Sequence, residues 1–254
     1  DDQVPIRILP AFQAFHGTHG AEGGAGHVRA LMARNTDRLR YGLVKMMLDG
    51  SIQGFSARLR WPGHYNGAPN GIWVTAPAQY EADFETYHRA GLLIHTHTNG
   101  DEASEAAIDA IGRVLARAPR PDHRHTLQHG QMIDAPLFRR MAALGLCANL
   151  FANHLWYWGD QHYEMTMGPD RAMRLDACAS ALAGSMPRRR YPVTIARMKA
   201  IGVAARPRVS SAGEGARIFM CRNARRRGTN CNLDGTRRAR RTTNLAPSAG
   251  RRRP

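Results

Sequence analysis

The sequence predicts an α/β fold built around a parallel β-sheet. Up to about residue 187, apolar runs with a period of two alternate with segments of helical period, and this alternation is typical of βα units. Hydrophobic residues make up 43% of the 254 residues, which is enough for a globular core. From these two observations we expect five βα units in residues 1–187, followed by a segment of different character.

Each predicted element follows from a local pattern. Apolar runs predict strands at residues 5–12, 41–48, 91–97, 123–129 and 146–150. The clearest helix spans residues 101–118, because its apolar residues fall on one stripe, with Asp101 at its start and Arg117 near its end. Two further helices are expected at residues 135–144, before Gly145, and at residues 170–182.

The segment from Gly50 to Pro77 shows no sustained period. It holds five Gly, three Pro and two Trp, and its only charged residues are Arg58 and Arg60. Loops of this length in compact domains usually have a function, and in βα barrels they lie at the face where active sites form. We therefore expect a long βα loop that acts as a lid or a binding loop.

Other features of the composition exclude whole classes of protein. No run approaches the roughly 18 apolar residues of a membrane span, and the first residues lack the pattern of a signal peptide, so no membrane partner is expected. The four cysteines form no C-x-x-C pair, which argues against a disulfide framework and a structural zinc site. We therefore expect a protein of the reducing cytoplasm.

The positive charge lies in one part of the chain. Of the 36 Lys and Arg residues, 19 lie from residue 188 onward, where only Glu214 and Asp234 are acidic. That segment has a net charge of +17, whereas residues 1–187 have a net charge of −1. The basic character therefore gives no indication that the predicted fold itself binds nucleic acid.

Histidines gather where two of the predicted strands end. His95 and His97 close one strand, and His123, His125 and His129 lie along the next. Alternate residues of a strand share a face, so each group is expected to point one way. Because imidazole is the commonest metal ligand and parallel strands end at one edge, the pattern predicts a metal site, with hydrogen-bonded core histidines as the alternative.

Lys45 interrupts an otherwise apolar strand. Burying an ammonium is costly unless it is paired or chemically altered, so an inward-facing Lys45 predicts a functional role. The alternative is an outward side chain that reaches solvent. Asp49 has the same parity as Lys45 and is a competing oxygen ligand.

Four segments together resemble one enzyme family. They read VKMMLDGSIQGFSARL, GLLIHTHTNGDEASEAAIDAI, RHTLQHGQMID and NHLWYWGDQHYEMTMGPDRAMRLDACASAL. In this order and spacing, over about residues 5–186, they resemble the amidohydrolase superfamily, in the branch (amidohydrolase family 3) that includes the YtcJ-like proteins and N-substituted formamide deformylase. The resemblance implies a metal-dependent-hydrolase (β/α)8 TIM-type barrel, of which about five βα units are present.

The resemblance also implies roles for individual residues. In such enzymes the fourth barrel strand supplies a lysine, often carboxylated to bridge two metals, and the fifth and sixth strands supply one His each. It implies that Lys45, His97 and His129 bind one or two divalent ions, most simply zinc, with His95 and His125 near the substrate. The implied reaction is hydrolysis of an amide- or formamide-type C–N bond, other than a peptide bond, in a small molecule.

Two departures from the family pattern bear on activity. No His-x-His of a first barrel strand precedes Pro5, so the barrel is expected to be truncated at its N-terminal side. After Pro187, where the family has a strand ending in Ser-Asp, this chain continues with Arg188. The catalytic Asp of the eighth strand is then absent, and we expect negligible activity from this chain.

Residues 188–254 are expected to be a disordered, non-homologous tail. They contain none of the twelve histidines and several Arg runs. A shift of reading frame in a GC-rich gene would produce this composition. The alternatives are a basic arm that binds nucleic acid and, for the whole chain, a catalytically dead barrel fragment.

Aromatic residues follow the last predicted strand. Trp156 and Trp158 flank Tyr157 and are candidate walls of a substrate pocket, or else they pack against the long loop. The sequence leaves open the identity of the substrate, the number of metals and the oligomeric state.

Overall fold

A computed structural model describes residues 6–14 and 20–183 of the chain. These residues belong to the first of two units into which the chain divides, residues 1–201 and 202–254. The predicted tail, residues 188–254, lies outside the described residues.

The fold is α/β, as the sequence predicts, and its centre is a single parallel sheet. Five strands follow one another in the order β1-β2-β3-β4-β5, so each strand pairs with its neighbour in sequence. Their bounds are Ala11–Gln13 for β1, Leu43–Met47 for β2, Leu93–Thr98 for β3, Thr126–His129 for β4 and Cys147–Leu150 for β5. Strands that are parallel neighbours need a crossover between them, and the helices provide it.

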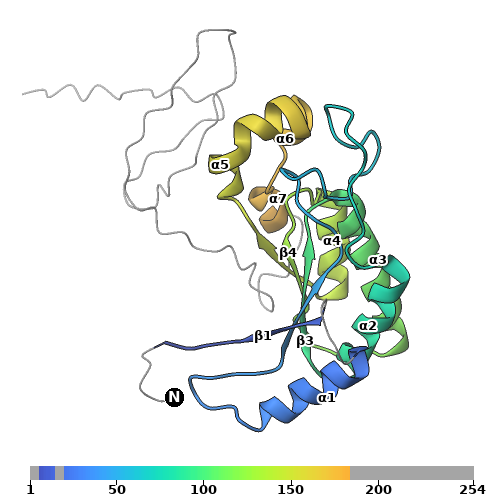
Figure 1. Cartoon of the computed structure of the whole chain (residues 1–254), viewed down its shortest axis with the longest axis vertical. Helices are drawn as coiled ribbons and strands as arrows, with labels where there is room; N and C mark the ends of the chain where they lie inside the picture. The colour runs from blue at the N-terminus through green and yellow to red at the C-terminus, as the bar shows by residue number, and fades with distance from the viewer. Residues whose placement is uncertain (1–5, 15–19, 184–254) are drawn as a thin grey trace, which may run out of the picture. The chain divides into compact units, whose positions relative to one another are not determined.

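The helices alternate with the strands. They are α1 (Gly20–Met32), α2 (Pro77–Arg89), α3 (Asp101–Arg117), α4 (Ala135–Leu144), α5 (His154–Gln161), a π-helical turn η2 (His162–Thr166), α6 (Pro169–Ala172) and α7 (Cys178–Ala183). Helices α2, α3 and α4 lie side by side on one face of the sheet, whereas α5 and α6 follow β5 at the other end from α1 (Figure 1). Every described strand except β5 is thus linked to the next strand by a helix.

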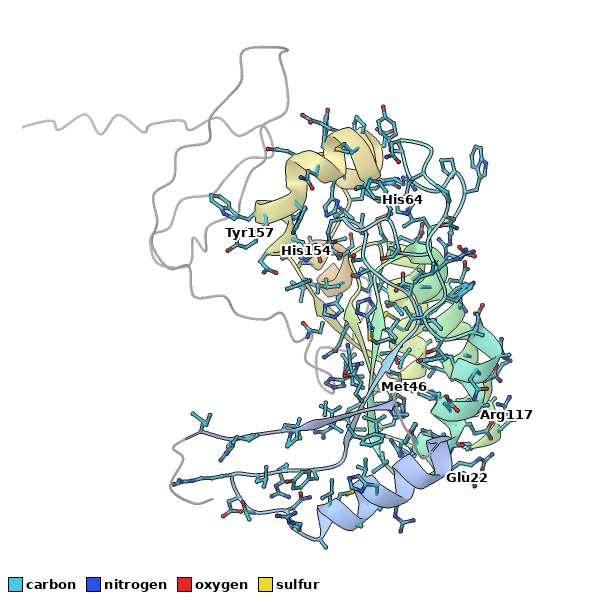
Figure 2. The ribbon with its side chains drawn as sticks, viewed as in Figure 1. Glu22, Met46, His64, Arg117, His154 and Tyr157 are labelled. Carbon is cyan, nitrogen blue, oxygen red and sulfur yellow. The ribbon has the colours of Figure 1, made fainter. Side chains whose placement is uncertain are left out.

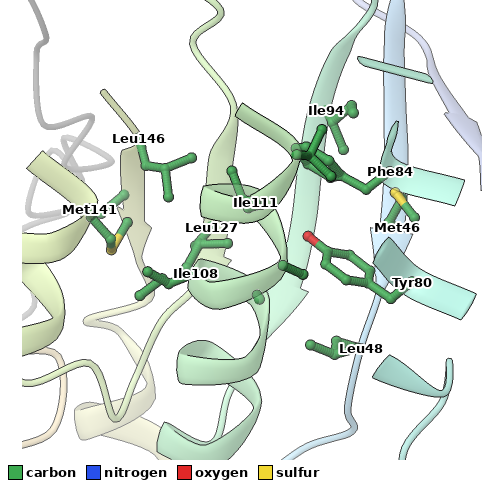
Figure 3. Packing of buried hydrophobic residues seen from close by; sticks show 14 of the residues in the cluster. Met46, Leu48, Tyr80, Phe84, Ile94, Ile108, Ile111, Leu127, Met141 and Leu146 are labelled. Carbon is green, nitrogen blue, oxygen red and sulfur yellow. The ribbon is translucent and has the colours of Figure 1, made fainter. Parts of the chain in front are cut away.

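The hydrophobic core lies between the sheet and helices α2, α3 and α4 (Figure 3). Alternate strand residues such as Val44, Ile94 and Leu127 are fully buried against the helices. Burying a side chain of this size contributes roughly 1.5–3 kcal/mol, so this layer is the main source of stability. The fully buried Tyr80 and Phe84 of α2 belong to the same layer.

The two helices that the sequence predicts most clearly form as expected. Asp101 stands in the first turn of α3 and Arg117 in its last turn, where each complements the helix dipole. The Asp134 carboxylate accepts a hydrogen bond from the Leu137 N–H and caps α4, which ends at Gly145 with a φ of 73°. Local signals therefore set both ends of α4.

The first predicted strand and the last predicted helix need correction. The strand expected at residues 5–12 is displaced: β1 covers Ala11–Gln13, and Ile8 makes only a single bridge with Leu39. The helix expected at residues 170–182 is two helices, α6 and α7. They are interrupted at Asp176, which has a φ of 50° and donates its N–H to the Gln131 carbonyl.

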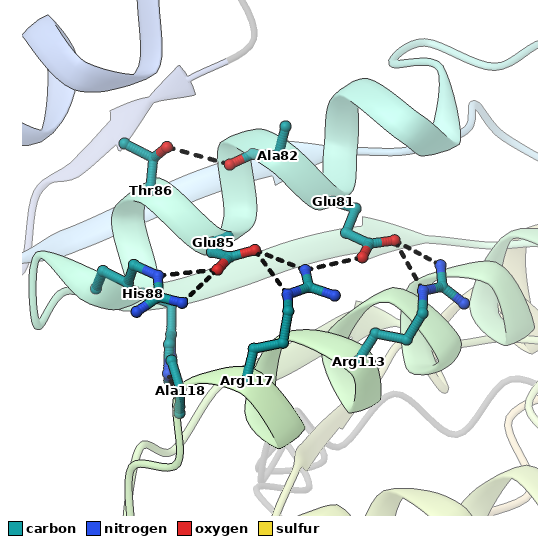
Figure 4. A network of polar contacts seen from close by, with 9 residues as sticks. Glu81, Ala82, Glu85, Thr86, His88, Arg113, Arg117 and Ala118 are labelled. Carbon is teal, nitrogen blue, oxygen red and sulfur yellow. Dashed lines mark hydrogen bonds and ion pairs between the residues drawn. The ribbon is translucent and has the colours of Figure 1, made fainter.

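Exposed ion pairs join α2 to α3 (Figure 4). Glu81 binds Arg113 and Arg117, and Glu85 binds Arg117 and Arg89, at distances of 2.6–2.9 Å. The hydrogen bond from Arg117, followed by that from Arg89, lowers the pKa of Glu85 to about 2. Each exposed pair of this kind adds little to the stability of the protein. Their main effect is therefore on how α2 and α3 are aligned.

None of the helices in the described part of the chain combines the length and the apolar character that a bilayer crossing needs. Within the same residues, Cys147 and Cys178 are both free thiols.

Candidate functional site

Polar side chains lie in register across the face of the sheet that is turned away from α2, α3 and α4, which we call the inner face. Residues paired in a parallel ladder share a face. Two rows cross the inner face: Gln13, Lys45, His95, Thr126 and Cys147, and then Met47, His97, Gln128 and Asn149, one step nearer the C-terminal ends of the strands. The inner face therefore offers hydrogen-bonding groups where a packed barrel would offer apolar ones.

Lys45 points to the inner face from the middle of β2. Its Nζ donates a hydrogen bond to Gln128 Oε1, and Gln128 Nε2 lies 3.0 Å from His95 Nδ1. Burial lowers the pKa of Lys45 to about 8. Burial and then the Lys45 charge lower the pKa of His95 to about 4, so the imidazole is neutral at pH 7.

His97 stands near the end of β3 and is held by the start of the long loop. Its Nε2 lies 3.0 Å from the Gly50 carbonyl oxygen, which also accepts a hydrogen bond of 2.8 Å from Asn99 Nδ2. A carbonyl can only accept, so this shorter contact favours a proton on Nε2 and a lone pair on Nδ1, while the donor Asn99 Nδ2 lies farther from Nε2, at 3.2 Å. Burial lowers the pKa of His97, which keeps the ring neutral.

His129 ends β4 beside His97. The two ring centroids are 4.7 Å apart. A φ of 75° at His129 takes the backbone out of the strand, so its side chain does not follow the alternation of β4. Burial, followed by the neighbouring His97 and Lys45, lowers the pKa of His129 to about 3.

This donor set fits a divalent metal in kind. Metal-binding imidazoles must be neutral, and they commonly donate their second N–H to a backbone carbonyl, as His97 does to Gly50. The set is incomplete in number: within the described residues, no group of three or more His, Cys, Asp or Glu side chains is placed to hold one ion. His97, His129 and Lys45 therefore fit as part of a metal site and not as a whole one.

Asp49 does not face the inner surface as a free oxygen ligand. It is fully buried, and its carboxylate accepts backbone N–H bonds from Asn99 and Gly100 at 2.9 Å and from Arg58 at 3.0 Å. Burial raises the pKa of Asp49 to about 7, against these N–H groups, which lower it. Its structural effect is to tie the end of β2, the long loop and the start of α3 together beside His97.

The long loop is fixed to the helices by its two charged residues. Arg58 binds Glu102 at 2.9 Å and lies over the ring of Trp73, and Arg60 binds Glu105 at 2.8 Å. A second, smaller hydrophobic cluster contains Ile52, Ala57 and Leu59 of the loop together with Met167, Ala172 and Leu175. Both arginines are thus engaged in holding the loop to its surroundings.

His125 lies on the helix side of the sheet, so the expectation that it shares a face with His129 is wrong. Its Nδ1 accepts a hydrogen bond of 3.1 Å from the Ile94 N–H, and its Nε2 lies 2.9 Å from His88 Nδ1 of α2. The cause lies at His129: His125 keeps the parity of Leu127, which is buried in the hydrophobic layer, whereas His129, with a φ of 75°, leaves the alternation of β4.

A model of the amidohydrolase family matches residues 2–187. The chain belongs to this family. The match ends at the residue where the composition of the sequence changes. The resemblance on which the sequence analysis relied is therefore confirmed at the level of the family.

Individual relatives of this amidohydrolase are distant. The Bacillus subtilis (strain 168) protein YtcJ is 25% identical over 112 residues, which are 44% of this chain and 21% of that protein. An uncharacterized metal-dependent hydrolase from Pyrococcus furiosus superposes with a TM-score of 0.57 at 16% identity, covering 72% of this chain and 36% of the other. The corresponding values for a metal-dependent hydrolase from Pyrococcus horikoshii OT3 are 0.51, 18%, 63% and 32%. These structures support the fold, and the chain spans about a third of their length.

His154 lies near the candidate site and was not predicted from the sequence. It begins α5, is buried, and its Nδ1 has no hydrogen-bond partner (Figure 2). The Phe151 ring lies between it and His129, with centroid distances of 4.4 and 5.2 Å. His154 follows β5 closely, as His97 and His129 stand at the ends of β3 and β4. A histidine near a third strand end was therefore the feature of the sequence from which this residue could have been predicted.

The aromatic residues after β5 lie on the surface of the amidohydrolase fold. Trp156 is 61% exposed and Tyr157 71% exposed, and Trp158 is half-buried. Because two of these side chains are largely exposed, the structure does not show them as walls of a pocket. Their part in a substrate pocket stays a prediction.

Proposed function

We propose that residues 2–187 are the part of a metal-dependent amidohydrolase that supplies three of its metal-binding groups, Lys45, His97 and His129, for hydrolysis of a non-peptide amide or formamide bond in a small molecule. The observation that carries the proposal is the meeting of His97 and His129, 4.7 Å apart, at the ends of adjacent parallel strands. Family membership supports the reaction class.

The side chains have distinct tasks in this proposal. His97 and His129 hold the ion through neutral nitrogens, and the Gly50 carbonyl fixes the ring of His97. When bound, a divalent metal such as zinc supplies Lewis acidity that polarises the scissile carbonyl. Asp49 sets the loop and strand end against which His97 rests, and His95 faces the substrate side of the sheet.

Lys45 is proposed to act after reaction with CO2. Because burial lowers its pKa to about 8, part of it is free amine at neutral pH. The amine nitrogen attacks the carbon of CO2 and loses a proton, which gives a carbamate whose oxygens can bind metal. Lys45 shares the inner face with His95 and His97, and this placement supports the proposed role.

A first prediction tests the ligand assignment. Replacing both His97 and His129 with Ala should remove most of the zinc that the purified full chain retains, because it removes both imidazoles at the strand ends. Elemental analysis after exposure to zinc and gel filtration measures this. The matched control is His27→Ala on the exposed side of α1, which should leave the zinc content unchanged.

Two outcomes would count against the assignment: equal zinc in all three proteins, or loss of zinc in the His27 variant alone. Turnover is a separate measurement. Since the described residues hold no complete ligand set, we expect negligible hydrolysis of N-acyl and formamide substrates by this chain even when zinc is bound.

A further inference from the structure

Phe151 is a large apolar side chain that is left partly exposed at the inner face. It directly follows β5, and the alternation of that strand, continued by one residue, places it on the side of Cys147 and Asn149, opposite the buried Leu150. Phe151 is 37% exposed. A single exposed apolar residue needs no functional explanation by itself, so the surroundings of Phe151 decide whether it has a role.

The backbone of Phe151 is fixed on both sides. Its N–H donates a hydrogen bond of 2.9 Å to the carboxylate of the buried Asp176, and its carbonyl accepts one of 2.9 Å from the His154 N–H. The Asp176 N–H in turn donates to the Gln131 carbonyl just after β4, also at 2.9 Å. The Phe151 ring therefore stands at a defined place beside the ends of β4 and β5, which is what a binding site requires of its side chains.

The Phe151 ring belongs to a series of three rings that begins at the candidate metal site. Its centroid lies 5.2 Å from that of His129 and 4.4 Å from that of His154, and both pairs are tilted. Among the described residues, no other exposed aromatic side chain has a ring contact with His97 or His129. Phe151 therefore offers apolar surface directly beside a group that the proposed hydrolysis uses.

We propose that Phe151 is a specificity-determining residue, which binds an aromatic ring that the substrate carries next to its amide bond. The inference rests on the proposed hydrolase function, because that function places the amide beside His129. Ligand sites combine apolar surface with a few polar groups that fix orientation. The rows across the inner face supply chiefly polar groups, and Phe151 supplies apolar surface. Aromatic rings in tilted pairs gain more than apolar burial alone, so a substrate ring extends the series.

Binding is measured in the full chain without metal, so that neither turnover nor zinc content enters the result. Acetanilide, an amide with a phenyl ring, and acetamide, which lacks the ring, are titrated and followed by ligand-observed NMR. We expect acetanilide to bind, and acetamide to show no binding at the same concentrations. Phe151→Ala should weaken the binding of acetanilide roughly tenfold, because one aromatic partner is lost.

The matched control is Tyr157→Ala. It removes another exposed aromatic ring, on α5, where Tyr157 is 71% exposed (Figure 2). This change should leave the affinity for acetanilide as it is in the wild type. Failure of acetanilide to bind the wild type, an unchanged affinity in folded Phe151→Ala, or equal weakening by Tyr157→Ala would each overturn the proposal.

A second variant covers the case in which circular dichroism shows that Phe151→Ala does not fold. Phe151→Leu keeps an apolar side chain but no ring, so it should weaken the binding of acetanilide and spare that of N-butylacetamide, whose apolar group is not aromatic. Equal loss of both ligands would contradict the aromatic preference. The zinc measurement on the double variant of His97 and His129 is independent: retained zinc there removes the metal assignment, whereas normal binding by the Phe151 variants removes only the present proposal.

Discussion

The same residue type serves two purposes on the two faces of one sheet. On the inner face, neither His97 Nδ1 nor the ring of His129 takes part in a hydrogen bond among the described residues, and the two rings lie side by side. On the helix side, His125 and His88 are consumed by hydrogen bonds to each other and to backbone groups. Burial makes all four neutral, and only the hydrogen-bond partners distinguish a candidate ligand from a structural histidine.

The helix-side histidines predict a loss of stability in acid. Burial, followed by the neighbouring His123, Arg120 and His88, lowers the pKa of His125 to about 2, below its unfolded value of 6.5. Between these values the unfolded chain holds one more proton, so stability falls as pH falls. The geometry agrees, since a proton on Nδ1 would face the Ile94 N–H donor.

His125→Gln tests this at residue scale. The variant should be about 1–3 kcal/mol less stable at neutral pH, because a buried hydrogen-bonding group is lost. Its stability should depend less on pH between about pH 6 and about pH 5, by roughly 1.4 kcal/mol per pH unit for one proton. Urea unfolding at both pH values measures this, with the exposed His27→Gln as control; an undiminished pH slope in His125→Gln would refute the assignment.

The limits of sequence reasoning at residue scale are visible in β4. The alternation that places Lys45 and His97 on one face holds because β2 and β3 are regular. It fails at His129, because this residue adopts a positive φ although it is not a glycine, so His129 does not share a face with His125. The contacts of Gln128 with Lys45 and His95 were not predicted, because they arise from cross-strand register, which one sequence does not contain.

At the scale of elements, the loop between β2 and α2 is positioned by close backbone contacts. Gly100 directly precedes the first residue of α3 and donates its N–H to Asp49. A Cβ at Gly100 would meet the carbonyl oxygen of Arg58 at 1.7 Å, so no larger residue fits while the loop keeps its place. The loop that the sequence predicts as a lid is, in this structure, packed against the start of α3.

Gly100→Ala therefore should destabilise the protein by about 1–3 kcal/mol, the usual range for overpacking. Thermal unfolding monitored by circular dichroism measures this. The matched control is Gly26→Ala in the interior of α1, where a Cβ would have no neighbour within 4 Å. That change should instead stabilise by about 0.5–1 kcal/mol. Similar changes in unfolding temperature for the two variants would contradict the prediction, because they would mean that the backbone near Arg58 moves aside at little cost.

At the scale of the whole molecule, the sequence predicts the order of the elements better than their ends. Four of the five strands and the helices α3 and α4 lie where periodicity places them, because the apolar residues of these elements form the one hydrophobic layer. The first strand was misplaced because Ile6, Ile8 and Leu9, although apolar, remain exposed. The period of apolar residues alone does not show which apolar run pairs with a neighbouring strand of the sheet.

The edges of the sheet predict association. Among the described residues, β1 and β5 each have one strand neighbour, so each leaves a row of backbone groups unpaired by strands. We expect the protein to associate as its concentration rises. Ala11→Lys places a charge on the exposed edge strand β1 and should reduce association measured by light scattering, whereas Ala33→Lys, exposed after α1, should not. A concentration-independent monomer would contradict the prediction.

The polar inner face separates the positions that fold the protein from those that carry its chemistry. The side chains that β2, β3, β4 and β5 bury in the hydrophobic layer point to the helices. Exchanges at Met47, Gln128 or Asn149 on the other face leave that layer intact. Evolution can therefore alter the recognition surface of this scaffold while its folding determinants stay constant, and these are the positions at which relatives sharing the architecture are free to diverge in what they accept.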